Sequence, residues 1–598
     1  MSLNKNILIL FFIFTGVIYS QKEDEINDSI STKSLEEVLI TATRTIRQLS
    51  SIPLPAQIIS KEQLKNSNSV RLTDILNEQT GLITIPDVGG GEGLQIQGVD
   101  AAYTLIMIDG VPLVGRLGGT LDLDRITVAN IKQIEIVKGA SSSLYGSEAM
   151  GGVVNIITDT PTNGFKGSFY NRLGTFSTND TNLDLSYKNE KLAITGSINR
   201  FSTKGYNLDD YSLTRTIMPY NNYTFQTKVK YDFSNKTSLT LSSRLFIQDQ
   251  ETNSEYTNEI GNTNILYGDA GVNEWNSTVK LAHKITNSWD IYGEVYATEY
   301  QTNSQINNID GSIFDNDFFN QVFIRPEFRA HYNPNKIHSI IFGAGITHET
   351  LDRTYFDGIP EFNAPYVYGQ YDLNLFDKLN IILGARYDAH NKYESQFSPK
   401  IAARYKISKK LAVKSSVGYG YKAPDFRQLF LNFTNPTRGY TVLGHNLVTS
   451  ELPKMDERGE LTENFDINPI INEYQDDLKA ESSVNINFGL DYKFNNKLKL
   501  NINIFRNNIS NLIDTQVIAS KGNGQNVFSY YNANKVYTEG LEFNAFYKPT
   551  NHIQVSGGYQ LLYAKDKEVE DKYKNGEVFS NQFSSPLKSS HYFGLPNR

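Results

Sequence analysis

Apolar and polar side chains alternate with a period of two through most of the chain, from about residue 163 onward. The segment LKLNINI at 498–504 is apolar at every second residue, and LNIILGARYDA at 379–389 follows the same pattern except at Ile382. Successive side chains of a strand point to opposite faces, so each segment predicts a strand with one apolar face. About 17 or 18 such strands of roughly ten residues predict a transmembrane antiparallel β-barrel.

The connections between these segments fall into two classes. Short turns are predicted at 234–236, 335–336, 376–378 and 495–497, and long polar loops at 202–221, 248–273, 303–318 and 432–479. A barrel in an asymmetric membrane has short turns on one side and long loops on the other. A soluble β-sandwich, the alternative fold, explains neither this division nor the length of the alternation.

Residues 44–162 show a different pattern, which predicts a small α+β domain. Apolar positions in 64–77 suit one or two short helices. Strands are predicted at 52–60, 81–85, 94–97, 105–108 and 131–137.

The chain ends indicate export and an incomplete barrel. Residues 1–20 resemble a signal peptide, with Lys5 before a short apolar run and small residues near Ser20. Residues 21–34 are polar and without period, as in a flexible linker. We expect the last strands to be missing, because the chain stops at Arg598 directly after a segment that begins a strand.

The amino-acid composition excludes several classes of function. The chain has 36 Tyr, 33 Phe and only 2 Trp, a net charge of -8 and a mean hydropathy of -0.40. These values suit a barrel with aromatic girdles and give no basic nucleic-acid footprint. The absence of cysteine excludes disulfides, thiolate metal sites and a cysteine nucleophile. No catalytic triad is visible, so we expect no enzymatic activity.

Four motifs in the N-terminal domain occur in the order found in the plug of TonB-dependent outer-membrane receptors, and the chain resembles that family. They are Gln97-Gly98, the segment MIDGVP at 107–112, the strand ending at Lys138-Gly139, and the stretch from Tyr145-Gly146 to the strand after Gly151-Gly152. The family's usual Arg is Gln97 here. The motif residues expected to position the plug are Gly98, Asp109, Gly110, Lys138, Gly139, Tyr145, Gly146, Gly151 and Gly152.

The resemblance implies a 22-stranded barrel with the plug, residues 44–162, inside its lumen. Residues 163–598 would form the barrel, incomplete at the C-terminus. It also implies residence in the outer membrane of a Gram-negative bacterium, in contact with outer-membrane lipid. The energy would come from TonB, acting with ExbB/ExbD in the inner membrane.

Residues 35–43, LEEVLITAT, resemble the TonB box, which pairs with its partner by strand addition. The residues expected to contact TonB are Glu37, Val38, Leu39, Ile40, Thr41, Ala42 and Thr43. Val38, Ile40 and Ala42 would share one face of an extended segment. The alternative is an ordinary first strand of the plug.

The candidate ligand residues are His445, Arg438 and Tyr440 of the longest loop and Arg427. Arg427 lies in the segment 420–429, which resembles a box found on one barrel strand of these receptors, and 478–482 resembles a second box of the family. A histidine between the two barrel boxes of the family's haem receptors can be an axial iron ligand, so His445 would be a metal ligand if haem is carried. A solvated loop residue is the plainer interpretation. Aromatic rings and arginines suit a flat, partly apolar ligand.

The sequence therefore predicts a receptor for the energised uptake of a scarce, large nutrient. An iron chelate, a ferric siderophore or haem, is the expected cargo, carried as a ligand and not as a prosthetic group. Cobalamin is the next candidate, followed by sugars or peptides, and a surface lipoprotein is a candidate partner. A passive porin or adhesin, the other class, would have neither plug nor box.

Overall fold

The computed structural model describes residues 38–45, 47–69, 71–86, 91–209, 214–257, 263–376, 378–533, 535–550, 553–576 and 588–594. The predicted signal peptide, the linker and residues 35–37, with Glu37, lie outside the described residues. Within the described part, no helix is both long and apolar enough to cross a membrane.

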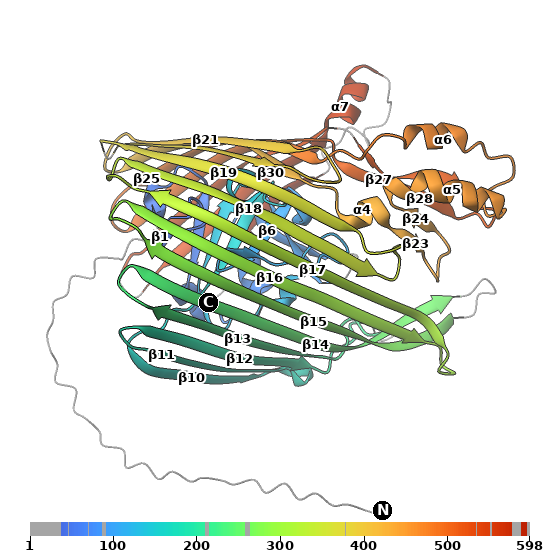
Figure 1. Ribbon diagram of the computed structural model, residues 1–598, viewed down its shortest axis with the longest axis horizontal. Coiled ribbons are helices and arrows are strands. Elements are labelled where there is room, and N and C mark those ends of the chain that lie inside the picture. Colours follow the sequence, from blue (N-terminus) through green and yellow to red (C-terminus); the bar gives the residue numbers. More distant parts are fainter. Residues whose placement is uncertain are drawn as a thin grey trace, which may run out of the picture. The chain divides into compact units, whose positions relative to one another are not determined.

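Most of the described chain forms one antiparallel sheet of 18 strands (Figure 1). In spatial order the strands are β10 (Gly164–Leu173), β11 (Asn179–Lys188), β12 (Leu192–Thr203), β13 (Tyr220–Asp232), β14 (Thr237–Thr257), β15 (Thr263–Lys284), β16 (Trp289–Asn307), β17 (Ile313–Tyr332), β18 (His338–Arg353), β19 (Glu361–Leu375), β20 (Leu379–Asp388), β21 (Gln396–Lys406), β22 (Leu411–Lys422), β25 (Glu481–Lys493), β26 (Leu498–Ser510), β29 (Val536–Tyr547), β30 (Val555–Asp566) and β31 (Lys588–Gly594). Among the described residues, β10 and β31 are the two edges of this sheet.

The two faces of the sheet differ as the period of two predicts. In β19, Val367 is 47% exposed, whereas its neighbours Tyr366 and Tyr368 are 3% and 2% exposed. The apolar side chain therefore faces outward, toward lipid, and the tyrosines face inward. Ile382, which broke the pattern in 379–389, is 1% exposed because it packs in a cluster with Leu39 and Val137 of the N-terminal domain.

The N-terminal domain contains a five-stranded sheet in the order β3 (Ala56–Ser60), β8 (Ile131–Lys138), β9 (Gly152–Thr158), β6 (Thr104–Ile108) and β7 (Val111–Pro112). The β6 and β9 strands are parallel and the other pairs antiparallel. The predicted strands 105–108 and 131–137 are confirmed as β6 and β8. The strand predicted at 52–60 begins only at Ala56, because Pro53 and Pro55 cannot donate to a ladder.

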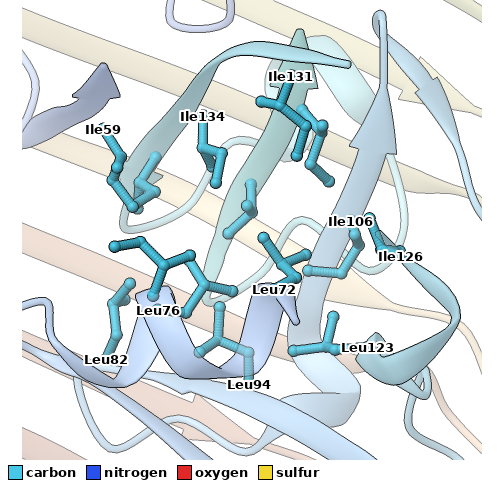
Figure 2. Close-up of a cluster of buried hydrophobic side chains, with 14 of the residues drawn as sticks. Ile59, Leu72, Leu76, Leu82, Leu94, Ile106, Leu123, Ile126, Ile131 and Ile134 are labelled. Atoms are coloured by element: carbon cyan, nitrogen blue, oxygen red, sulfur yellow. The ribbon is translucent and has the colours of Figure 1, made fainter. Parts of the chain in front are cut away.

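The predicted helical segment 64–77 contains two short helices, α1 (Lys61–Ser67) and α2 (Leu72–Asn77). Figure 2 shows α2 against the sheet, with Leu72 and Leu76 facing Ile59, Ile134 and Ile106. The segments 81–85 and 94–97 were expected in the same sheet. They instead pair with each other as a separate hairpin, β4 (Leu82–Pro86) and β5 (Glu92–Ile96), and bring Leu82 and Leu94 into the core.

Short elements connect these parts. They are β1 (Val38–Leu39), β2 (Arg47–Gln48), η1 (Leu49–Ser51), η2 (Ala101–Tyr103), η3 (Leu123–Arg125), α3 (Ser142–Tyr145), η4 (Thr175–Ser177), α4 (Phe426–Phe430) and α7 (Lys567–Lys574).

Ion pairs join the N-terminal domain to strands spread along the large sheet. Their barrel partners are Lys228 on β13, Glu274 on β15, Glu327 on β17, Asp372 on β19 and Glu542 on β29. Because strands from β13 to β29 all contact it, the sheet curves around this domain, which is a plug.

Two of the predicted long loops are wrong. The segment 248–273 is largely strand, because β14 and β15 remain paired as far as Thr257 and Thr263. Likewise, β16 and β17 occupy most of 303–318. Their polar side chains hid the strands, because a hairpin that extends into water needs no apolar face.

The longest predicted loop, 432–479, is folded. It contains β23 (Asn432–Thr434), β24 (Thr441–Leu443), η5 (His445–Leu447), α5 (Val448–Glu457) and α6 (Asn468–Glu473), and it joins β27 (Ile513–Ser520) and β28 (Asn526–Asn532) in a four-stranded sheet. Leu443, Val448 and Leu452 form its core with Ile518 and Val527. We call this unit, 432–479 with 513–532, the cap.

Candidate functional site

The predicted box is only partly extended. Val38 and Leu39 pair with Gln48 and Arg47, but a turn begins at Thr41. Val38 and Ile40 are exposed, whereas Ala42 is buried, so the expected shared face of these three residues is wrong. The turn moves Ala42 inward, where it packs with Leu39 against Ile382.

One buried carboxylate of the plug holds the box. Glu135 on β8 accepts hydrogen bonds from the amides of Ile40 and Thr41, at 3.0 and 2.8 Å, and from the Thr41 hydroxyl at 2.5 Å. The Tyr145 hydroxyl donates to the Thr41 carbonyl at 2.8 Å. Burial raises the pKa of Tyr145 to about 12, so its phenol stays protonated and remains a donor.

Arg44, the next residue after the box, ties the chain to the barrel wall. Its guanidinium lies 2.6 Å from Glu327 on β17 and 2.6 Å from the Tyr368 hydroxyl on β19. It also donates to the carbonyl of Leu144 in the plug at 3.0 Å. A force applied to the box would therefore act on both the plug and the barrel wall.

The charged plug-motif residues contact the wall. Lys138 lies 2.9 Å from Glu542 and donates to the Thr80 carbonyl at 2.6 Å. Asp109 lies 2.8 Å from Lys228 and accepts from the amide and hydroxyl of Thr158. The motif strands thus present charges that fix the plug in the lumen.

The glycines of the motifs permit close approach. A Cβ at Gly98 would lie 2.7 Å from Leu562, and one at Gly139 would lie 2.4 Å from Asn485. Both have positive φ, so any side chain there would be strained as well as crowded. The other motif glycines, Gly110, Gly146, Gly151 and Gly152, lie in turns and strands of the plug, as the sequence predicted. Gln97, in the place of the usual Arg, is 1% exposed and reaches Asn487 on β25 at 3.5 Å.

A group of arginines and aromatic rings lies where α4, the end of β18 and the cap meet. We call Arg353, Arg427, Tyr355, Phe433, Tyr440 and Tyr530 the mouth cluster. The rings form a connected series: Tyr355 lies 4.8 Å from Phe433, which lies 6.2 Å from Tyr440. The Arg427 guanidinium lies 5.7 Å from the Tyr530 ring and donates to the carbonyl of Gly118 in a plug loop at 2.7 Å.

The arginine side chains of the mouth cluster lie beside aromatic rings. The Arg353 guanidinium lies 5.5 Å from the Tyr355 ring and 5.6 Å from Phe319. Burial, reinforced by Asp317, raises the pKa of Tyr355 to about 12, which leaves its hydroxyl a donor. Cationic donors beside aromatic faces suit a planar, anionic, aromatic ligand.

The structure brings together two of the four predicted ligand residues. Arg427 and Tyr440 belong to the mouth cluster. Arg438 is exposed on the turn between β23 and β24, where its amide donates to Asn435.

His445 is not placed as a haem ligand. It is 7% exposed, with Nδ1 2.9 Å from the Tyr530 carbonyl and Nε2 2.8 Å from the Asp476 carbonyl. Both ring nitrogens therefore lie at hydrogen-bond distance from backbone carbonyls, and the solvated-loop alternative is wrong because the side chain is buried. The residue joins three segments of the cap. No group of three or more metal-binding side chains occurs in the described chain.

Replacing His445 by alanine should loosen the cap and leave the choice of iron source unchanged. Removing the ring leaves the buried Tyr530 carbonyl without this partner, at a cost of about 1–3 kcal/mol, and also removes the contact to the partly buried Asp476 carbonyl. Hydrogen exchange should rise at 445–476, while Asn446→Ala, an exposed neighbour, changes little. A selective loss of growth on haemin with an unchanged cap would restore His445 as an iron ligand.

Comparison with known proteins identifies the family. The family model described as the TonB-dependent receptor plug domain matches residues 48–153. The model described as the TonB dependent receptor-like β-barrel matches residues 157–594. The chain belongs to the TonB-dependent receptor family. It is therefore an outer-membrane transporter that works with inner-membrane TonB, and not an enzyme.

Individual relatives are distant. The iron-regulated outer membrane virulence protein of Vibrio cholerae is 21% identical over 561 residues, which cover 90% of this chain and 79% of that protein. The vitamin B12 transporter BtuB of Vibrio cholerae is 34% identical over 125 residues, only 21% of this chain and 20% of that protein.

Solved structures share the fold. The siderophore receptor PirA of Pseudomonas aeruginosa has a TM-score of 0.64 at 19% identity and covers 86% of this chain and 85% of that one. A mutant of the ferric enterobactin receptor PfeA of Pseudomonas aeruginosa has a TM-score of 0.68 at 17% identity, with 89% and 83% covered.

Glu135, Glu327 and Arg353 are among the residues of these sites that were not found from the sequence. Glu135 had a signal, because it is the one charge among the apolar residues of IEIV in β8. Glu327 is one of several inward-facing charged residues in β17, so nothing in the sequence distinguishes it from the others. Arg353 is the last residue of β18, and only the fold brings it near Arg427.

Proposed function

We propose that this receptor takes up a ferric siderophore whose iron-binding groups are anionic and aromatic, such as a catecholate. The observation that carries the proposal is the mouth cluster, in which Arg353 and Arg427 lie among tyrosine and phenylalanine rings. Arginine fits carboxylate, phenolate and other planar oxyanions and stacks on aromatic faces. The aromatic rings add contact area at low entropic cost.

The relatives are consistent with this cargo, since an iron-regulated protein and siderophore receptors are among them. Haem is less well supported, because both nitrogens of His445 are occupied. The match to a vitamin B12 transporter gives weaker support to cobalamin, since it covers only 125 residues, 21% of this chain.

The segment 35–43 is proposed to be the site that TonB binds. In its docked state, Val38 and Ile40 are exposed, whereas Leu39 and Thr41 are held by the plug. Strand addition by TonB needs free backbone groups, so release from Glu135 would precede or accompany binding. ExbB/ExbD would supply the energy.

Binding of the ferric chelate should weaken strongly when the arginines lose their charge. We expect Arg353→Gln with Arg427→Gln to raise the Kd for ferric enterobactin by roughly 100-fold or more, since each charge-assisted contact contributes about 1.5–3 kcal/mol. The matched control is Arg458→Gln, an exposed cap arginine paired with Glu460.

Growth under iron chelation separates the cargo classes. Cells that depend on this receptor should grow with ferric enterobactin, and should grow poorly with a ferric hydroxamate or haemin. Growth with the hydroxamate alone would reject the aromatic ligand class. Rescue by cyanocobalamin in an auxotroph, with no rescue by any iron source, would overturn iron uptake as the function.

A further inference from the structure

The short turns of the large sheet form a rim that is rich in lysine. Eight turns join β11–β12, β13–β14, β15–β16, β17–β18, β19–β20, β21–β22, β25–β26 and β29–β30. Every one contains a lysine or directly follows one. These lysines are Lys188, Lys191, Lys236, Lys284, Lys336, Lys378, Lys406, Lys409, Lys410, Lys493, Lys497 and Lys548. The turns themselves hold only two acidic residues, Glu190 and Asp377.

The rim lysines are available to a partner. All are exposed except Lys406, which is half-buried. In the part of the chain that the structure describes, no ion pair joins any of them to a carboxylate. Their charge is therefore not neutralised by an ion pair among the described residues.

Large apolar side chains accompany the lysines around the rim. Those that are exposed include Tyr187, Tyr231, Phe233, Ile285, Trp289, Ile337, Phe376, Tyr405, Ile407, Phe494 and Tyr547. Several form ring pairs: Tyr231 lies 5.0 Å from Phe233, and Trp289 lies 4.5 Å from Tyr332. Amphipathic rings and lysines with long apolar stems are the side chains that sit at the boundary between hydrocarbon and headgroups.

The rim lies at the end of the sheet where the box is. Arg47, the partner of Leu39, is bonded to Asp372 on β19, which ends just before the turn at 376–378. Figure 1 shows the short turns at one end and the cap, in orange, at the other. On the proposed function, in which TonB binds the box from the inner-membrane side, the rim faces the periplasm.

The opposite end differs in charge. Between Asn432 and Lys479 the cap has nine acidic residues against four basic ones. The chain is therefore polarised, with positive charge at the periplasmic rim and negative charge outside.

We infer that the rim is a binding surface for anionic phospholipid headgroups of the periplasmic leaflet, such as phosphatidylglycerol. The lysines follow the line along which the barrel would meet that leaflet, and several are beside an exposed apolar side chain that can enter it, such as Lys284 beside Ile285 and Lys493 beside Phe494. A protein partner would need a contiguous patch, whereas these charges run through all eight turns. Each lysine near an anionic surface favours binding by roughly five-fold.

The test measures lipid selectivity of the whole receptor. The receptor is reconstituted in phosphatidylcholine vesicles with traces of spin-labelled phosphatidylglycerol or phosphatidylcholine, and the association of each label is compared. We expect a several-fold preference for phosphatidylglycerol that falls in 0.5 M salt, because exposed charges are screened. The eight-site variant with K191Q, K236Q, K284Q, K336Q, K378Q, K410Q, K497Q and K548Q should lose most of this preference, since only four of the twelve rim lysines remain.

Two controls make the outcome specific. Lysine to arginine at the same eight positions keeps the charge and should keep the preference. Heat-modifiable migration in gels checks that each variant is a folded barrel, and the salt response of the wild type tests the inference without any variant.

Three results would overturn the inference. One is an unchanged preference in the glutamine variant. Another is loss of the preference in the wild type when about 20 mM inorganic phosphate is added, which would assign the lysines to free anions. The third is a glutamine variant that keeps the preference but no longer binds the periplasmic domain of TonB, which would assign the rim to a protein partner.

Discussion

Ile40→Pro should abolish energised uptake and leave ligand binding to cells intact. The Ile40 amide donates to Glu135 in the docked box, and an extended segment that pairs with TonB would need the same donor. Proline removes it and fixes φ, so both states are affected. Losing a main-chain bond and the pairing geometry costs on the order of 3 kcal/mol, which is roughly a 100-fold loss of uptake.

The matched control for this change is Ile40→Ala, which keeps the amide and shortens an exposed side chain. It should retain most of the uptake. If Ile40→Pro transports at the wild-type rate, residues 35–43 are only a structural strand of the plug, and TonB must bind elsewhere.

Glu274→Ala should loosen the plug from the wall. Glu274 is buried on β15 and bonds Arg125 of the plug at 3.0 Å and Arg244 of β14 at 3.1 Å. The two guanidiniums are 2% and 6% exposed, so removing the shared carboxylate leaves two buried like charges facing each other. Breaking a buried network of this kind costs about 3–5 kcal/mol.

This loosening is measured as leak. Single-channel conductance and sensitivity of cells to a large antibiotic should both rise in Glu274→Ala. Glu539→Ala, which removes the exposed partner of Arg506, should change neither, because such pairs contribute at most about 1 kcal/mol. If Glu274→Ala changes neither conductance nor antibiotic sensitivity, the plug is held without the ion pairs that join Glu274 to Arg125 and Arg244.

Local pattern was sufficient for much of the architecture. Alternation of period two predicted the strands of the large sheet, because one face of each strand meets lipid and the other the lumen. The α+β pattern before residue 163 predicted the plug, including β6, β8 and the two short helices. Its four motifs led to the family, since they are short turns and strands that are defined by residues near in sequence.

Contacts between distant segments decided the rest. Glu135 with Thr41, Arg44 with Glu327, and Arg353 with Arg427 lie far apart in the chain. Their charged side chains look like those of ordinary surface residues until the large sheet curves around the plug. The fold of the cap was also hidden, because its strands come from two loops and its core forms only when they meet.

The sequence by itself determined the class of protein and its compartment and predicted the position of the box, because these follow from local periodicity and contiguous motifs. Only the tertiary structure decided that the box is docked by Glu135, that both nitrogens of His445 are occupied, and that two arginines share an aromatic mouth. The physical reason is that hydrogen bonds and ion pairs depend on distance in space, which residues far apart in the chain do not record in sequence.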